Sequence, residues 1–190
     1  MSKFLISAAL VAASLVPSAA AAQAVPAAIV AVVDLDRVTR DCNACKTAAA
    51  ALKSQLASLT SREAQLAGPL KTEGQAIQKA LDAGGGKPDA ALEARIKTFQ
   101  TKQQSGAAEL RRQQEQLQRN QAHIQQQIQT KLGPIYQQVM QRRGANVLME
   151  TGSTLATAAS VDVTNDIVAA LNTSLPSLQV TAPAQAQPSR

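Results

Sequence analysis

The chain has no tryptophan and few other aromatic residues for its 190 residues. Phe4 lies in an N-terminal apolar run, so Phe99 and Tyr136 are the only aromatic residues after it. A dense globular core of this size would normally use more, because aromatic side chains supply much of the buried area. Scarce aromatics together with abundant Ala, Gln, Leu, Lys and Arg are typical of long exposed helices.

Residues with catalytic chemistry are also scarce. The one histidine, His123, lies among glutamines, and no Ser, His and acidic residue are spaced for nucleophilic catalysis. Gly84–Gly86 lacks the preceding strand that a phosphate-binding loop requires. A zinc site would have only His123 and scattered carboxylates to complete it. The sequence therefore predicts a binding protein, not an enzyme, with no cofactor and no metal.

Long hydrophobic runs are absent except at the start of the chain. Phe4–Val16 is apolar but too short to span a membrane. It follows a basic start at Lys3 and precedes small residues over 18–22, the pattern of a signal peptide. We expect residues 1–22 to be this signal, cleaved after Ala22 or Ala24, and the mature chain to be exported.

Positive charge is concentrated in the middle of the chain. The net charge is +6, yet residues 42–143 hold fifteen Lys and Arg against seven Asp and Glu, a net of +8. Predicted export and the lack of interleaved aromatics exclude nucleic acid as a partner. Acidic protein segments and anionic lipid head groups remain as candidates. An equally good reading is that the charge keeps a helical surface soluble.

The same region has helical periodicity and predicts a hairpin. Leucines fall seven residues apart, Gly84–Pro88 interrupts the pattern, and a second helical stretch follows as far as Arg143. We expect an antiparallel coiled-coil hairpin over 42–143 with its tip at 84–88. Each arm would span on the order of 60 Å. The expected seam residues are Leu52, Leu56, Leu59, Leu66, Leu70, Ile77, Ile96, Gln103, Leu110, Gln114, Leu117, Gln121, Ile124, Ile128 and Ile135.

Helix-breaking residues coincide at one height of this hairpin. Folding the chain at the tip places Gly68 and Pro69 close to Gly106. Proline removes a helix hydrogen bond and glycine removes side-chain contacts, so both arms are weakest there. The sequence is compatible with a hinge at Gly68, Pro69 and Gly106, or with a static kink.

The segments that flank the hairpin predict a small body made of residues 25–41 and 144–174. Strands are expected at Ile29–Val33, Ala145–Met149 and, more weakly, Thr154–Ala159, followed by a short helix capped by Thr164. About 48 residues are marginal for independent folding, and three strands leave edges unpaired. We expect this body to oligomerise, and residues 175–190 to be disordered. The expected oligomer core comprises Val30, Val32, Val147 and Met149.

Cys42 and Cys45 form the one motif with chemical content. A Cys-x-x-Cys at a helix N-terminus is also found in thioredoxin-like oxidoreductases, but no βαβ pattern surrounds it here. In an oxidising compartment a local structural disulfide between Cys42 and Cys45 is favoured over redox catalysis.

Several segments together resemble the Skp/OmpH family of periplasmic chaperones for outer-membrane proteins. They are residues 29–38, the Gln- and Lys-rich hairpin, residues 144–149 and residues 162–172. The resemblance implies a periplasmic homotrimer with a small barrel-like body and three helical arms around a cavity. It also implies ATP-independent holding of unfolded outer-membrane β-barrel proteins, without catalytic residues. The Cys42–Cys45 pair departs from the family.

The sequence thus predicts an α+β, mostly α fold and three competing functions. The first is a holdase chaperone whose partners are unfolded outer-membrane proteins, its own copies and anionic lipid or lipopolysaccharide. The alternative is an envelope coiled-coil structural or adaptor protein, which would need a fuller apolar seam and no breaks in its arms. A thiol-disulfide enzyme using Cys42 and Cys45 is the third.

Overall fold

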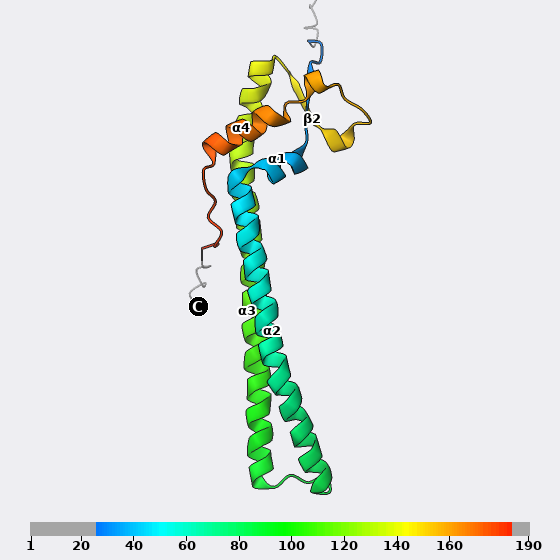
Figure 1. Cartoon of the computed structure of the whole chain (residues 1–190), viewed down its shortest axis with the longest axis vertical. Helices are drawn as coiled ribbons and strands as arrows, with labels where there is room; N and C mark the ends of the chain where they lie inside the picture. Colours follow the sequence, from blue (N-terminus) through cyan, green and yellow to red (C-terminus); the bar gives the residue numbers. More distant parts are fainter. Residues whose placement is uncertain (1–25, 184–190) are drawn as a thin grey trace, which may run out of the picture.

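A computed structural model describes residues 26–183 of the chain as a long helical hairpin rooted in a small mixed body (Figure 1). The expected α+β, mostly helical fold class is confirmed. The expected signal peptide, residues 1–22, lies outside the described residues. The elements are β1 (Val30–Val33), α1 (Leu35–Asp41), α2 (Asn43–Ala83), α3 (Ala90–Arg143), β2 (Val147–Glu150), the 3-10 turns η1 (Thr151–Ser153) and η2 (Ala159–Val161), and α4 (Thr164–Ser174).

Helices α2 and α3 form the hairpin, and local chemistry sets its tip. α2 ends where Gly85 and Gly86 adopt positive φ of 67° and 83°, which residues with a side chain rarely adopt. α3 begins where the Asp89 side chain accepts a hydrogen bond of 2.8 Å from the backbone N–H of Leu92. With 41 and 54 residues, the two helices extend on the order of 60 to 80 Å at about 1.5 Å per residue.

The two helices pack antiparallel along a thin seam that differs in part from the expected one. Ile77 and Ile124 are buried, but Leu56 is 53% exposed. Gln103, Gln114 and Gln121 are exposed as well, so these three and Leu56 were wrongly placed in the seam. The buried residues of α3 instead include one small and one polar residue, Gly106 and Asn120. A search for apolar heptad positions cannot find these two residues.

The body contains two paired strands, not three. β1 and β2 are parallel, with Val30 opposite Val147 and Val32 opposite Met149. The other edge of β1 is met by residues 162 and 163, where the Val163 N–H donates to the Val32 carbonyl at 2.9 Å. The strand expected over residues 154–159 is wrong, because residues 154–158 form a loop between η1 and η2 and Ala159 begins η2. The segment lacks the alternation of large apolar and polar residues that a half-buried strand needs. Its one large apolar side chain, Leu155, is fully exposed.

Two helix starts also differ from expectation. α1 begins at Leu35, ahead of the hairpin expected from residue 42, because the Asp34 carboxylate caps it by accepting from the Arg37 N–H at 2.7 Å. Thr164 is not a cap of α4 but its first residue, and it is fully buried. Its hydroxyl accepts a hydrogen bond of 3.0 Å from the Asp34 N–H, which joins the end of β1 to the start of α4.

A single apolar core lies where the hairpin enters the body. α4 crosses α3 there and α1 lies beside both (Figure 1). The best buried residues of α4 are Ile167 and Leu171, both with no exposed surface. The core residues are Ala31, Val33, Val38, Cys42, Ala44, Cys45, Leu132, Ile135, Val139, Val163, Ile167, Leu171 and Leu175.

Residues 175–183 lie along α3, which corrects the expectation of disorder for this part of the 175–190 segment. Leu175 is 6% exposed and Leu178 packs against the core. These two leucines sit in a segment rich in Pro, Ala, Gln and Ser, whose average composition hid them. The remaining residues of the expected tail lie outside the described part of the chain. Within residues 26–183, no helix combines the length and apolar character that a membrane crossing needs.

The core predicts where the body is sensitive to mutation. Leu171→Ala should lower the free energy of unfolding by about 2 to 5 kcal/mol, the usual cost of emptying a buried leucine site. Leu56→Ala, which truncates a mostly exposed leucine of the arm, is the control and should cost far less. Urea unfolding followed by circular dichroism would measure both, and equal midpoints would contradict this account of the core.

Candidate functional site

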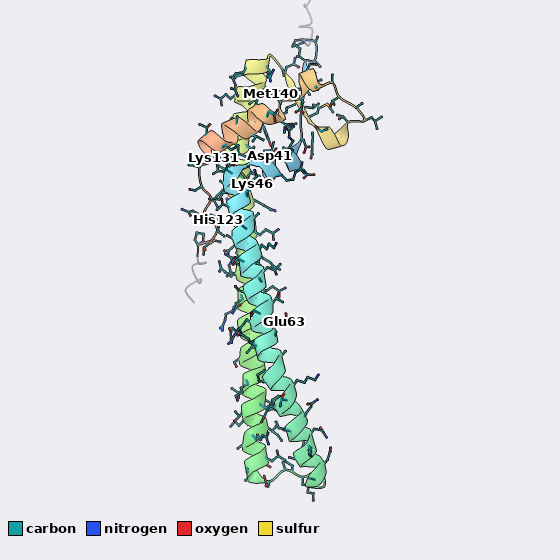
Figure 2. All side chains as sticks on the ribbon, in the orientation of Figure 1. Asp41, Lys46, Glu63, His123, Lys131 and Met140 are labelled. Carbon is teal, nitrogen blue, oxygen red and sulfur yellow. A yellow bond between two sulfur atoms is a disulfide. The ribbon has the colours of Figure 1, made fainter. Side chains whose placement is uncertain are left out.

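The arm presents most of its side chains to solvent (Figure 2). Glu63 is exposed on the outside of α2. Half-buried leucines hold the middle of the arm together in place of a fully buried apolar row. The candidate functional surface is therefore a long, polar and basic arm with a weak interior.

Two bidentate ion pairs join the helices across this weak interior. The Arg62 guanidinium donates to the two carboxylate oxygens of Glu109 at 2.8 and 3.0 Å. Arg95 donates in the same way to Glu73 at 2.6 and 3.0 Å. These hydrogen bonds, more than the opposite charges themselves, lower the pKa of Glu109 and Glu73 below the ordinary value. Paired geometry of this kind fixes the register of two helices.

A cavity of about 350 Å³ lies between the two ion pairs. Leu66, Pro69 and Gly106 are among the residues that line it. A β-carbon on Gly106 would lie 3.5 Å from the Leu66 side chain, and one on Gly68 would meet nothing within 4 Å. The structure thus brings Pro69 and Gly106 to one cavity, as the sequence predicted, while Gly68 faces open space. Both helices continue through this level without a break.

The four residues expected in the oligomer core lie on one face of the strand pair. Because strand residues alternate between faces, Val30, Val32, Val147 and Met149 project opposite to the face that packs on the core. Val32 is buried at 2% exposure, but Val30, Val147 and Met149 remain 36 to 38% exposed. Parallel sheets are normally covered on both faces. This apolar face is therefore incomplete in a single chain.

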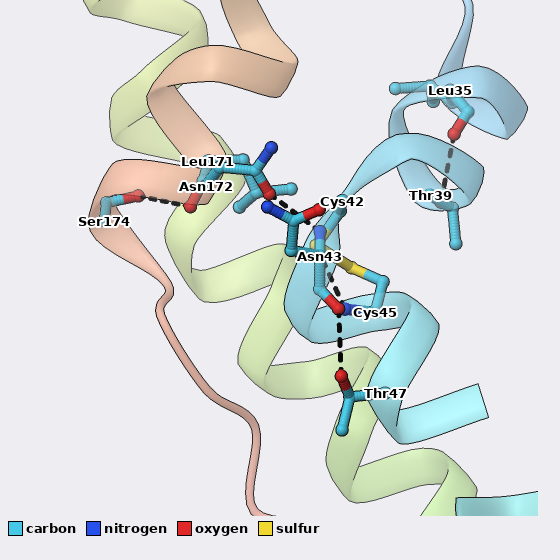
Figure 3. The surroundings of a disulfide bond; sticks show 9 residues. All are labelled: Leu35, Thr39, Cys42, Asn43, Cys45, Thr47, Leu171, Asn172 and Ser174. Atoms are coloured by element: carbon cyan, nitrogen blue, oxygen red, sulfur yellow. Dashed lines mark hydrogen bonds between the residues drawn. A yellow bond between two sulfur atoms is a disulfide. The ribbon is translucent and has the colours of Figure 1, made fainter. Parts of the chain in front are cut away.

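Cys42 and Cys45 are joined by a disulfide at the joint between α1 and α2 (Figure 3). Their Cα atoms are 5.1 Å apart, and the residues are 0% and 5% exposed. The Asn172 side chain of α4 accepts a hydrogen bond of 2.8 Å from the Asn43 N–H beside them. A sulfur that exchanges disulfides must be reached by an attacking thiolate. This buried position favours the structural role over the redox one.

No group of three or more potential metal ligands occurs among residues 26–183. His123 is half-buried, and its Nε2 atom is enclosed with no hydrogen-bond partner among the described residues. Figure 2 places it on the side of the arm where residues 175–183 lie. Sequence reasoning also missed Gln55, Gln116 and Asn120, which form a polar network across the arm, and Gln127, which bonds to Gln179. For the three residues on α3, the density of amides in that helix was the only signal.

Comparison with known proteins places this architecture in a family. Residues 29–171 match the family described as "Outer membrane protein (OmpH-like)". The chain belongs to the OmpH-like family, because the match covers well over half of its length. A comparison with curated proteins finds no match.

A solved structure has the same fold. It is the crystal structure of a Caulobacter crescentus protein described as an OmpH-like candidate outer membrane chaperone. The two superpose with a TM-score of 0.67 at 20% sequence identity, over 82% of this chain and 90% of the other. At this identity, the likeness extends to the fold and no further.

The ion pairs predict a pH dependence of the arm. A carboxylate whose pKa is lowered by folding stabilises the native state above its unfolded value of about 4.3 and loses that contribution as the pH falls through the folded value. As the pH falls below about 5, the thermal midpoint of the wild type should therefore drop more steeply than that of the Glu73→Gln/Glu109→Gln variant. Glu63→Gln, at an exposed site with no ion pair in the described chain, is the control. Parallel pH profiles for all three would refute the assignment.

Proposed function

We propose that the chain is an ATP-independent holdase chaperone of the periplasm that binds unfolded outer-membrane β-barrel proteins. In this proposal three copies join through their bodies, and the client is held in the cavity between their arms. Membership of the OmpH-like family supports a chaperone role, and so does the fold shared with the Caulobacter protein.

The observation that carries the proposal is the arm itself. A hairpin of 41- and 54-residue helices leaves most of its surface unburied within its own chain. Such a surface works by contact with another molecule. Its net positive charge and its half-buried leucines suit many weak contacts. Several arms joined in one oligomer add these contacts, because each arm is present at a high effective concentration near the client.

The weak interior of the arm separates this function from that of a rigid envelope adaptor. An adaptor that holds one partner in a fixed position would need a continuous apolar seam, whereas this arm has a cavity between its ion pairs. Anionic lipid or lipopolysaccharide is a further partner that we propose for the basic arm. We assign no catalytic role to any residue.

The direct test is suppression of aggregation. A urea-unfolded outer-membrane β-barrel protein diluted into buffer should remain soluble in the presence of the purified chain, and nucleotide should make no difference. Light scattering would follow the reaction, and a small soluble protein of equal charge is the control. Aggregation at the rate seen with the control protein would disprove the holdase function.

Assembly can be tested at the exposed apolar face of the strands. Val147→Asp should dissociate the oligomer, because a carboxylate at a face buried between subunits costs several kcal/mol of desolvation. The folded monomer should survive, since Val147 is 36% exposed within one chain. The matched control is Leu56→Asp on the arm, which should stay oligomeric. Multi-angle light scattering gives the masses, and a monomeric wild type would contradict the proposed trimer.

We also propose that the arm bends at Gly68, Pro69 and Gly106. This bending would let the space between the three arms fit clients of different size. Replacing all three with Ala improves helix propensity by about 1 kcal/mol for each Gly and about 3 for Pro. The stiffened arm should show a narrower distribution of distances between spin labels at Lys46 and Lys79. It should also protect large clients less well than small ones. An unchanged distribution would mean that these residues make a fixed kink.

A further inference from the structure

The side-chain amides of α3 bind the main chain of residues 175–183. The Gln127 amide accepts from the Gln179 N–H at 3.0 Å and donates to the Gln179 carbonyl at 2.9 Å. Further along, the Ala182 N–H donates to Asn120 Oδ1 at 2.9 Å, and Gln116 Nε2 lies 3.5 Å from the Ala182 carbonyl. The N–H and the carbonyl of Gln179, and those of Ala182, thus each meet a side-chain amide of α3.

This spacing suits any extended chain. Gln127 and Asn120 are seven residues apart on a helix, a rise of about 10.5 Å. Gln179 and Ala182 are three residues apart, a length of about 10 Å in an extended chain. The segment runs opposite to α3, from the body toward the tip of the hairpin (Figure 1). Helix and bound segment therefore stay in register over successive contacts.

Asn120 and Gln116 are also held in position by side-chain hydrogen bonds within the arm. Asn120 is only 3% exposed, and its Nδ2 donates to Gln55 Oε1 of α2 at 2.9 Å. Gln116 Nε2 donates to Asn120 Oδ1 at 2.7 Å. A buried asparagine is retained when its hydrogen bonds are satisfied, and here one of its partners is the bound main chain. The network thus fixes the acceptor that meets the Ala182 N–H.

The contacts at Gln179 and Ala182 involve main-chain atoms, which every sequence except proline shares. Between them along the segment, Thr181 reaches a groove of about 380 Å³ between α2 and α3, which Ser58, Leu59 and Gln113 also line. The groove continues the path of the segment toward the tip. A longer extended chain could therefore follow the same surface further than residues 175–183 do.

We propose that Gln116, Asn120 and Gln127 form a sequence-independent site for an extended segment of unfolded polypeptide, which residues 179–183 occupy until a client displaces them. The inference rests on the proposed holdase function and gives it a location on the arm. Because the occupant is tethered, its effective concentration is high, and a client must compete with it. The site selects unfolded chains, since folded proteins have already paired their main-chain groups.

The test compares the full chain with one that ends at Leu178, which keeps the leucines that pack on the core. The probe is a fluorescent peptide with the sequence of residues 176–183, measured by anisotropy. The shortened chain should bind this peptide, and an unfolded β-barrel protein, at least threefold more tightly than the full chain. Gln127→Ala in the shortened chain should remove most of the gain, whereas Gln126→Ala, at the exposed neighbour, should not.

Backbone methylation of the peptide separates main-chain recognition from side-chain recognition. A methyl group on the nitrogen of Gln179 removes a hydrogen bond to Gln127 and should abolish binding. A methyl group on the nitrogen of Val180, which bonds to none of the three amides, should leave binding within about twofold, and so should a scrambled sequence. Equal loss with both methylated peptides would overturn the proposal.

The outcomes also separate this inference from the proposed function. If the full and shortened chains bind peptide and client equally, the site is wrong while the holdase function stands. If neither chain keeps a β-barrel protein soluble, the holdase function is wrong. In that case, peptide binding that depends on Gln127 still supports the site as one for extended chain.

Discussion

The long arm depends on one apolar core at its root, where α4 crosses the end of α3 and α1 packs beside them. Ile167 and Leu171 are buried there against residues of the helix α3 that continues into the arm. The disulfide between Cys42 and Cys45 lies in the same core and fixes the turn from α1 into α2. A lever of on the order of 60 Å keeps its direction only if its base is rigid. The largest fully buried side chains of the described residues lie at this root, where the requirement is greatest.

Away from that root the arm is held by polar geometry more than by apolar burial. The pairs Arg62–Glu109 and Arg95–Glu73 fix the register, and a cavity is left between them. Exposed ion pairs contribute little stability, so the outer arm can adjust its shape at small cost. Polar geometry also dominates at the amides of Gln116, Asn120 and Gln127, which bond to main-chain atoms of residues 179 and 182 and not to their side chains. Both features are consistent with the holdase function that we propose.

Expectations from the sequence succeeded where a residue type allows one outcome. Gly85 and Gly86 end α2, and the β-branched run of β1 forms a strand that is buried over most of its length. They failed where a contact depends on a distant partner. Gln103 has the heptad spacing of a seam residue but is exposed. Gly106 and Asn120 are buried, although the apolar pattern did not place them in the seam.

The sequence by itself determined the mostly helical class and the hairpin with its glycine tip, because helical periodicity and glycine conformation are local properties. Only the tertiary structure decided that residues 175–183 dock on α3, that Thr164 bonds to Asp34 instead of capping its own helix, and that residues 154–159 form no strand. Each of these depends on groups more than 50 residues away or on a missing strand partner. Hydrogen bonds and burial between such distant residues arise from the folded arrangement, and no local pattern encodes them.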